Sequence, residues 1–381
     1  MILIRGVWRT SASGRLWIVG TFAIGLTDHL EGPREQPSSV IFDEVADLVR
    51  LADQLGVEYA WFSEHHGHAH CGHLPTPLLF ALHMAGQTQN IRLGTAIICL
   101  NLHHPLDVAE QVAVADVLTK GRIAVGFGSG STPEEFRLFG LAETDNEERH
   151  GRFAEALQLI CSIWCANRTK ADTGTSESAR YFPVPPHHSL PASSKDLLRR
   201  SWVAVNSVGS AKIAGRFNFN ILFSHLRTPD QYRQFRIAYR AAGGVGQIAA
   251  NRPIFVGPDD ESAFARVEPA LRTLWRRFRQ EGKIPAETVE PDRPQDLCAH
   301  PINFIVGGPV SVARQLLGLY EQVPFDVANV EVRWAGLSHE LVRDSLRRLM
   351  EDVMPILEHD KFGQRGVRTQ ERRSATEPES R

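Results

Sequence analysis

The sequence predicts an α/β fold, a (β/α)8 TIM barrel with insertions, and three observations support this prediction. Short apolar segments alternate with stretches whose apolar residues recur at helical spacing. Three apolar segments end abruptly in polar or glycine-rich residues: residues 59–62 in Ser63-Glu64-His65-His66, residues 91–100 in His103-His104, and residues 123–127 in Gly128-Ser129. The strand–helix unit recurs along the chain as often as closure of such a barrel requires. In this fold the chemistry gathers where the strands end.

The elements follow one another in a regular order. Strands are expected at residues 17–25, 59–64, 91–100, 123–127, 202–205, 220–223 and 253–256, with further strand segments at 303–306 and 327–334. Helices are expected at residues 38–51, 76–87, 105–118, 146–165, from 208, and at 229–242, 261–280, 309–320 and 338–357. Pro105 stands in the first turn of its helix, where the missing N–H is tolerated. Residues 169–194 are rich in Ser, Pro and Gly and are expected to form a long loop.

Composition excludes several classes of protein. At 381 residues the chain can bury a large core. Its formal net charge of −2 does not favour nucleic acid or an anionic membrane surface as a partner. Five scattered cysteines, an odd number, favour a reduced cytoplasmic protein over a disulfide framework. The sequence has no apolar run of the roughly 18 residues that a membrane span needs.

The chain is interpreted as one barrel domain, residues 16–360, between two short extensions. Residues 1–15 carry three arginines and no acid, and we expect them to form a flexible N-terminal extension. Residues 361–381 are charged and poor in large apolar side chains, which predicts a disordered tail.

Several motifs, taken in their order and spacing, resemble those of the bacterial luciferase-like flavin-dependent monooxygenases. They are Trp61-Phe62-Ser63-Glu64-His65-His66, Gly94-Thr95-Ala96, His104-Pro105, Thr119-Lys120-Gly121-Arg122 and Gly307-Gly308-Pro309. The resemblance covers about residues 17–357. It implies a TIM barrel and a reduced, dissociable FMN that a separate flavin reductase supplies. It also implies that one oxygen atom of dioxygen is transferred to a small organic substrate. A homo-oligomer, expected as a dimer, is a further prediction.

The resemblance assigns catalytic roles to the Glu-His-His motif. His65 matches the histidine near the reacting flavin, and an imidazole with an ordinary pKa near 6.5 suits a proton step at neutral pH. Glu64 would orient His65 or balance its charge, while His66 or His104 would line the pocket. The motif also has a purely structural interpretation, in which it pairs with arginines at the barrel rim.

Other positions match the family's flavin contacts. Ala96 and Ile97 match a bend in the backbone that lies under the flavin ring. Residues after the fifth strand, at a helix N-terminus that can hold a phosphate, are the expected phosphate contacts: Asn206, Ser207, Gly209 and Ser210. An ordinary helix cap explains the same residues. Gly128 and Ser129 lie in the glycine-rich turn where the luciferases have an arginine on the phosphate. Its absence leaves Lys212 or Arg216 as possible replacements.

Two other functions remain open. The same fold with a deazaflavin cofactor would transfer hydride without oxygen. A metal-dependent barrel hydrolase is suggested by the crowding of His65, His66, His68, His70, Cys71 and His73. The main interpretation includes no metal ion, and a flavin-binding relative without catalysis is a further alternative. Aldehydes, aromatic polyketides, sulfonates and amines all remain open as substrates.

Overall fold

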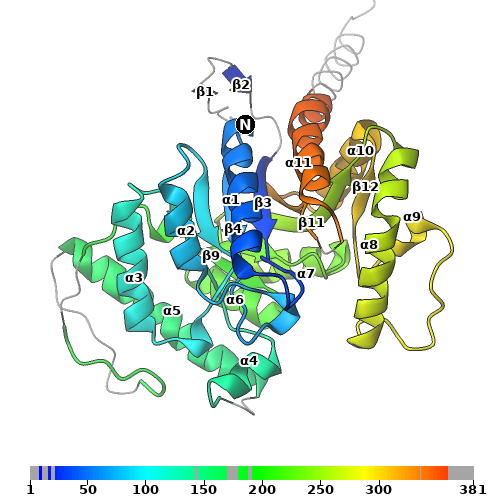
Figure 1. Cartoon of the computed structure of the whole chain (residues 1–381). Coiled ribbons are helices and arrows are strands. Elements are labelled where there is room, and N and C mark those ends of the chain that lie inside the picture. The colour runs from blue at the N-terminus through cyan, green and yellow to red at the C-terminus, as the bar shows by residue number, and fades with distance from the viewer. Residues whose placement is uncertain are drawn as a thin grey trace, which may run out of the picture.

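The computed structural model describes residues 8–10, 16–18, 22–141, 145–169, 179–187, 191–334 and 336–358. Its central feature is a ring of parallel strands (Figure 1). In chain order the strands are β3 Ala23–Asp28, β4 Tyr59–Phe62, β5 Arg92–Thr95 continued by β6 Ile98–Cys99, β7 Ile123–Ala124 continued by β8 Gly126–Gly128, β9 Trp202–Val205, β10 Asn220–Phe223, β11 Ile248–Val256 and β13 Val327–Glu331. Each pairs with the next, and β13 pairs with β3, so the ring closes. The predicted (β/α)8 barrel is confirmed.

A helix packs outside the ring after each strand. These helices are α1 Ser38–Leu55, α2 Pro77–Ala85, α3 Pro105–Leu118, α5 Asn146–Thr169, α6 Val208–Arg216, α7 Pro229–Ala241, α10 Pro309–Gln322 and α11 His339–Arg348. Several begin at a proline, whose fixed φ suits the first turn. Shorter elements are α4 Pro133–Leu138, the 3-10 turns Ala69–Cys71, Leu100–Leu102 and Leu198–Arg200, and a π turn at Leu349–Val353.

Aromatic side chains fill part of the barrel interior. Trp61 stacks on Tyr59 with 5.1 Å between ring centroids and meets Trp202 edge-on at 5.5 Å. Gly94 makes room for this cluster, because a Cβ there would lie 2.3 Å from Trp61 Cε3. The interior is therefore a packed core, and the chemistry is confined to the barrel mouth above it.

A side lobe, consisting of α8 Asp260–Gln280, α9 Pro294–Leu297 and β12 Ile305–Gly307, is inserted between β11 and α10. It has its own apolar core, which includes Trp275, Phe278 and Phe304. The first half of β11 pairs with β10 and β13, while its second half pairs with β12. Figure 1 shows this lobe beside the barrel.

The structure corrects three predicted strands. The first barrel strand is Ala23–Asp28 rather than residues 17–25, so its polar end lies at Asp28 and the residue after it. The seventh barrel strand begins at Ile248, five residues before the predicted start at 253. The segment predicted at 303–306 forms β12, which lies in the side lobe outside the ring.

Near the N-terminus, β1 Trp8–Thr10 and β2 Leu16–Ile18 pair antiparallel. The other residues of the predicted extension 1–15, and the predicted tail 361–381, lie outside the described residues. Within the described part of the chain, every helix is too short or too polar to cross a bilayer.

Candidate active site

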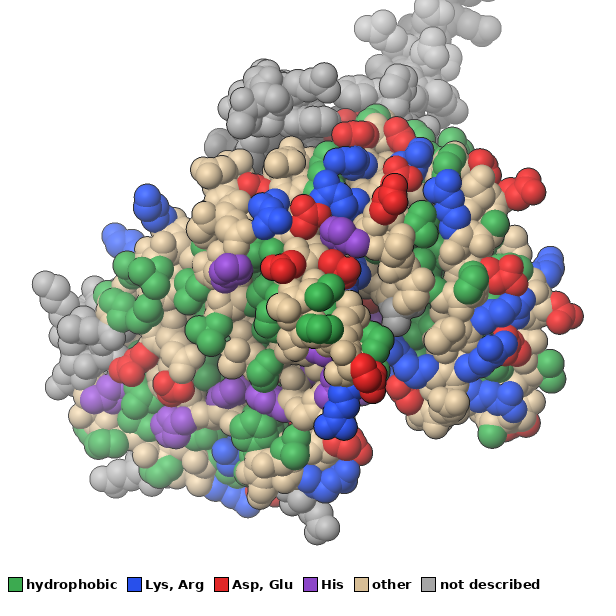
Figure 2. All heavy atoms as spheres, viewed as in Figure 1, with side chains coloured by type: hydrophobic (Ala, Val, Ile, Leu, Met, Phe, Trp, Pro, Cys, Tyr) green, Lys and Arg blue, Asp and Glu red, His purple; other side chains and the backbone are tan. Residues whose placement is uncertain are grey.

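Polar side chains converge at the carboxyl ends of the barrel strands. His29 follows β3, the motif from Ser63 onward follows β4, His225 follows β10, and Glu331 ends β13. Figure 2 shows several histidine side chains (purple) on this side of the molecule, near the indentation beside the side lobe. Since parallel strands point the same way, these residues lie at one mouth of the barrel.

His65 is held by a carboxylate that the sequence did not identify. Its Nδ1 lies 3.2 Å from Oε1 of Glu135, and that same oxygen accepts from the backbone N–H of His66 at 3.0 Å. Glu135 belongs to α4, seventy positions along the chain, and its side chain is buried. Burial favours the protonated acid, but the hydrogen bonds from His65 and His66 outweigh it and lower the pKa of Glu135. The ionised carboxylate therefore accepts a hydrogen bond from the Nδ1–H of His65, which leaves Nε2 as the ring nitrogen available for proton exchange.

Glu64 has other partners than the expected His65. Its Oε1 accepts from His103 Nε2 at 2.9 Å and from His66 Nε2 at 3.2 Å. Burial favours protonated Glu64, but these two histidines outweigh it and lower its pKa. The bond with Glu64 also raises the pKa of His103 against the opposing effect of burial. Glu64 therefore holds the imidazoles of His66 and His103, whereas His65 is bound by Glu135.

The adjacent histidines before α3 have separate functions. His103 points to Glu64, as described above. His104 is the N-cap of α3, where its Nδ1 accepts from the backbone N–H of Leu106 at 3.3 Å, and its ring meets Phe182 edge-on. The sequence prediction chose His104 as a pocket residue and missed His103, because adjacent positions in a loop give no signal of which side chain turns inward.

The backbone bend expected at Ala96 and Ile97 is present, because the peptide bond between them is cis. The Ala96 carbonyl accepts a hydrogen bond from Ser63 Oγ at 3.0 Å. Ile97 packs against Gly128, since a Cβ on that glycine would lie 2.7 Å from Ile97 Cδ1. Ser129 contributes its backbone oxygen to Asn101 Nδ2 at 2.8 Å. Together these residues form a close-packed wall beside β4, the strand that precedes His65.

The α6 N-terminus is a complete capping box. Ser207 Oγ accepts from the N–H of Ser210, and Ser210 Oγ accepts from the N–H groups of Asn206 and Ser207. Both hydroxyls are thus engaged by the helix itself. The N–H groups of Val208 and Gly209 remain as the first-turn donors that the helix does not use.

His150 of α5 lies directly over this helix end. A Cβ on Gly209 would be 3.1 Å from His150 Cε1 and 3.3 Å from its Nδ1. Burial and the charge of Arg149 lower the pKa of His150, so near neutral pH it is a neutral hydrogen-bonding group. Two free N–H groups, a glycine without a side chain and an imidazole fit a phosphate group. Of the expected replacements for the missing arginine, Arg216 ends α6 about 10 Å along its axis.

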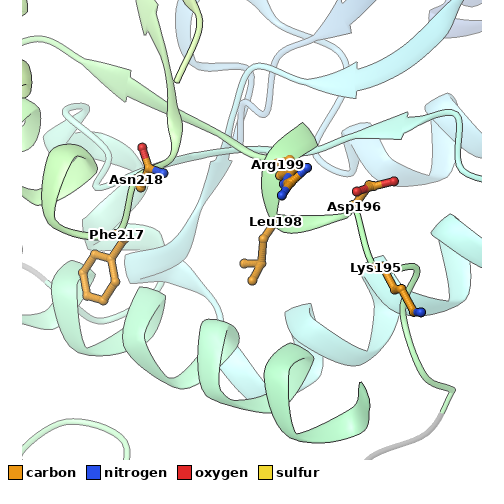
Figure 3. A pocket seen from close by; sticks show the side chains of 6 residues that line it. All are labelled: Lys195, Asp196, Leu198, Arg199, Phe217 and Asn218. Carbon is orange, nitrogen blue, oxygen red and sulfur yellow. The ribbon is translucent and has the colours of Figure 1, made fainter. Parts of the chain in front are cut away.

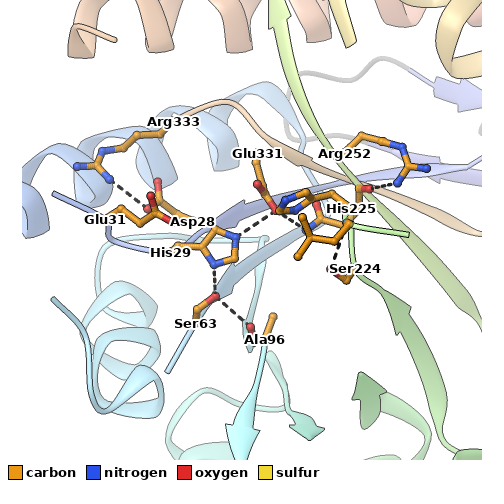
Figure 4. Close-up of polar contacts among 12 residues, drawn as sticks. Asp28, His29, Glu31, Ser63, Ala96, Ser224, His225, Arg252, Glu331 and Arg333 are labelled. Atoms are coloured by element: carbon orange, nitrogen blue, oxygen red, sulfur yellow. Dashed lines mark hydrogen bonds and ion pairs between the residues drawn. The ribbon is translucent and has the colours of Figure 1, made fainter. Parts of the chain in front are cut away.

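A second polar network was missed by the sequence prediction. Glu331 Oε1 lies 3.1 Å from His29 Nε2, 3.0 Å from His225 Nδ1, and within hydrogen-bonding distance of Asn251 Nδ2 (Figure 4). Ser63 Oγ, which donates to Ala96, lies 2.6 Å from His29 Nδ1. The expected strand end at residue 25 concealed His29, which follows the true end at Asp28.

This network favours the ionised forms of both Glu331 and His29. Burial opposes ionisation of Glu331, but the charges of His225 and His29 and their hydrogen bonds hold its pKa well below the ordinary value. Burial opposes the charged form of His29 too, yet the Glu331 charge and hydrogen bond outweigh it and raise the pKa of His29 to about 9.

The histidine-rich loop does not assemble the metal site considered from the sequence. His68 and His73 both contact the Gly32 carbonyl oxygen at 3.2 Å, and His70 contacts Thr132 Oγ1 at 3.1 Å. Within the described part of the chain, the groups of three histidine or acidic side chains close enough to share an ion are His29, His225 and Glu331, and Glu64, His66 and His103. Neither group includes His68, His70, Cys71 or His73.

A cavity of ≈ 540 Å³ lies elsewhere, at the amino ends of β9 and β10 (Figure 3). It is lined by Lys195, Asp196, Leu198, Arg199, Phe217 and Asn218. This end of a barrel contributes to stability rather than to catalysis. The candidate active site is therefore the opposite mouth.

Comparisons with known proteins identify the family of the chain. Residues 22–326 match the family model of luciferase-like monooxygenases. The oxygenase component of flavin-dependent trigonelline monooxygenase from Acinetobacter baylyi is 23% identical over 349 residues, which is 87% of this chain and 94% of that protein. An F420-dependent glucose-6-phosphate dehydrogenase from Beutenbergia cavernae is 33% identical over 165 residues, 43% of this chain and 44% of that protein.

Solved structures share the fold. The oxygenating constituent of 3,6-diketocamphane monooxygenase from Pseudomonas putida, a Type II Baeyer-Villiger monooxygenase in complex with FMN, superposes with a TM-score of 0.71. Its sequence is 20% identical, and the match covers 88% of this chain and 99% of that one. The family model spans most of this chain, from the first barrel strand to the start of the last. The chain therefore belongs to the luciferase-like monooxygenase family.

Proposed function

We propose that this protein is a flavin-dependent monooxygenase, the oxygenase component of a two-component system that uses reduced FMN from a separate reductase. The observation that carries the proposal is the His65–Glu135 pair, which lies at a strand end of the barrel mouth. The trigonelline relative, described as an oxygenase component, supports the dependence on a reductase.

In this proposal His65 is the acid–base group. Glu135 fixes the proton on Nδ1, so that Nε2 can hold or release a proton at the barrel mouth. A buried carboxylate that also binds the backbone of His66 keeps the imidazole in one orientation. A positioned acid–base group contributes typically about 10²- to 10⁴-fold to a rate.

The cofactor is held by two parts of the mouth. Ala96, Ile97 and Gly128 form the apolar wall for the ring system, and the α6 N-terminus with Gly209 takes the phosphate. Bound reduced FMN supplies two electrons, so that one oxygen atom of dioxygen enters the substrate and the other leaves as water. His66 and His103, fixed by Glu64, line the same mouth and face the small organic substrate.

The proposal includes a homodimer in the cytoplasm. Exposed apolar side chains on two neighbouring barrel helices support self-association: Leu79 on α2, and Val114, Val117 and Leu118 on α3. No disulfide joins the cysteines of the described residues, which suits a reducing compartment.

Flavin titration and turnover test the function. Purified protein is titrated with FMN and with the deazaflavin F420, and then supplied with reduced FMN and ¹⁸O₂ or with reduced F420 without oxygen. We expect FMN to bind and ¹⁸O to enter a product from a panel of aldehydes, aromatic polyketides, sulfonates and amines. The competing function, hydride transfer by deazaflavin, is favoured by the F420-dependent relative. Binding of F420 alone, with anaerobic turnover, would replace the monooxygenase proposal by that one.

A further inference from the structure

The cluster of His29, His225 and Glu331 has no role in the proton chemistry assigned to His65. Its three residues come from the ends of β3, β10 and β13. We propose that these side chains form a binding site for one divalent first-row transition-metal ion. The nitrogen and oxygen atoms concerned are His29 Nε2, His225 Nδ1 and Glu331 Oε1, which all lie within 4.8 Å of one another.

The first argument is the number of nitrogens around one oxygen. A carboxylate oxygen offers two lone pairs, yet Glu331 Oε1 has three nitrogens at hydrogen-bonding distance, from His29, His225 and Asn251. Three donors cannot all align with two lone pairs. An ion shared by the oxygen and the two imidazoles resolves this, because the histidines then act as ligands and Asn251 remains the donor.

The Glu64 cluster provides the contrast within the same molecule. Glu64 Oε1 has two donors, His66 and His103, which match its two lone pairs. Hydrogen bonds alone therefore satisfy that cluster. The two groups have the same ligand types, but only the Glu331 group has more donors than its oxygen can accept.

The second argument is the proton on His29. Ser63 Oγ donates its single hydrogen to the Ala96 carbonyl, so in its contact with His29 Nδ1 the serine must accept. The Nδ1 proton is therefore fixed, and Nε2 presents its lone pair to an ion once the ion displaces the proton that Nε2 shares with Glu331. Metal-bound histidines typically have this arrangement, in which the second ring nitrogen donates to a neighbouring oxygen.

The distances suit an ion of this size. Zinc and similar ions bind histidine nitrogen and carboxylate oxygen at about 2.1 Å, so two ligand atoms lie about 3.0 Å apart at right angles and about 3.4 Å apart at the tetrahedral angle. The observed separations from Glu331 Oε1 are 3.0 Å to His225 and 3.1 Å to His29. Small movements would therefore complete the site.

The donor set defines the class of ion. Two imidazoles and one carboxylate suit zinc, iron(II) or cobalt(II) rather than calcium or magnesium, which prefer all-oxygen ligands. The amide oxygen of Asn251 is buried and has no partner among the described residues. Other coordination positions are left for water or a substrate oxygen.

Metal binding is measured on the full chain without flavin and without an affinity tag. Zinc(II) is followed by equilibrium dialysis and calorimetry, and cobalt(II) by its visible absorption. We expect one equivalent in the wild type and background binding in Glu331→Gln and His225→Ala. Ser63→Ala keeps all three ligands and should weaken binding by about 10- to 100-fold. Glu64→Gln is the matched control and should retain the full equivalent.

Circular dichroism and thermal unfolding establish that each variant is folded. If Glu331→Gln does not fold, metal binding by His225→Ala and Ser63→Ala is compared with that of the wild type instead. Wild-type binding no greater than that of the folded ligand variants overturns the proposal and leaves a hydrogen-bonded cluster. Loss of the ion in Glu64→Gln alone also overturns it, because the ion then belongs to the other cluster. Both outcomes are independent of the flavin and so do not bear on the proposed monooxygenase.

Discussion

The phosphate site at the α6 N-terminus makes a prediction that separates flavin binding from stability. Gly209→Ala adds a methyl group that would lie 3.1 Å from His150 Cε1 and 3.6 Å from Ser207 Oγ, within the space assigned to the phosphate. We expect FMN to bind more weakly to this variant, while riboflavin, which lacks the phosphate, binds as it does to the wild type.

The magnitude follows from the donors at that helix end. An anion at a helix N-terminus gains about 0.3–1 kcal/mol from the helix dipole. A hydrogen bond to a charged group adds about 1.5–3 kcal/mol. The wild type should therefore bind FMN at least about tenfold more tightly than riboflavin, since a factor of ten needs only about 1.4 kcal/mol. Gly209→Ala should remove most of this preference.

The free energy of unfolding of Gly209→Ala should stay the same or rise, although FMN binding weakens. Alanine is favoured over glycine by about 0.8–1.0 kcal/mol in a helix interior, so the free energy of unfolding should not fall appreciably. Fluorescence titration with both flavins gives the two affinities, and urea unfolding gives the stability. Gln234→Ala, an exposed change on the neighbouring helix α7, is the control. Equal wild-type affinity for FMN and riboflavin, or equal weakening of both in Gly209→Ala, would refute the phosphate site.

Three further predictions concern the acid–base pair and the scaffold. His65→Ala should keep flavin binding and lower oxygenation by about 10²-fold or more, with reducing equivalents released as hydrogen peroxide; unchanged product yield would contradict its role. The pKa values of Glu64 and Glu135 are lowered in the folded state, so their stabilisation is complete above about pH 4.5. That stabilisation should be lost as the pH falls below this value. When the free energy of unfolding is measured by urea denaturation below pH 4.5, it should depend less on pH in Glu135→Gln than in the wild type. Asp116→Ala breaks a buried ion pair with Arg200 at 2.7 Å and should cost about 3–5 kcal/mol in unfolding free energy, which a loss under 1 kcal/mol would contradict.

Much of the scaffold could be predicted because its signals are local. The helix predicted at residues 105–118 coincides with α3, since Pro105 marks its first turn. The glycine-rich turns and apolar runs likewise placed β4 and β9. The first strand was placed too early, because an apolar stretch preceding Ala23 has the same composition as a strand. Composition also could not show that β11 is a single strand with two sets of neighbours.

The site was predicted only in part, for a physical reason. The motif residues His65 and Glu64 were located by their place after β4, but their partners come from remote segments. Glu135 and His103 are seventy and thirty-nine residues from the groups that they bind. A hydrogen bond across the barrel mouth depends on how several strands are brought together, and neither segment has a local pattern that specifies the other.

The continuity of β11 affects how substrate can enter. Nine residues run without interruption from the barrel wall into the side lobe, and both halves are tied to neighbouring strands. Closure of one domain on another usually depends on a few loop or terminal residues that absorb large changes in φ and ψ. A paired strand lacks such a point, so the side lobe should move together with the barrel as a single rigid unit. Entry of substrate then depends on the loops between strands and helices around the mouth. The most important of these loops is residues 65–74, which begins with His65, the residue that Glu135 binds.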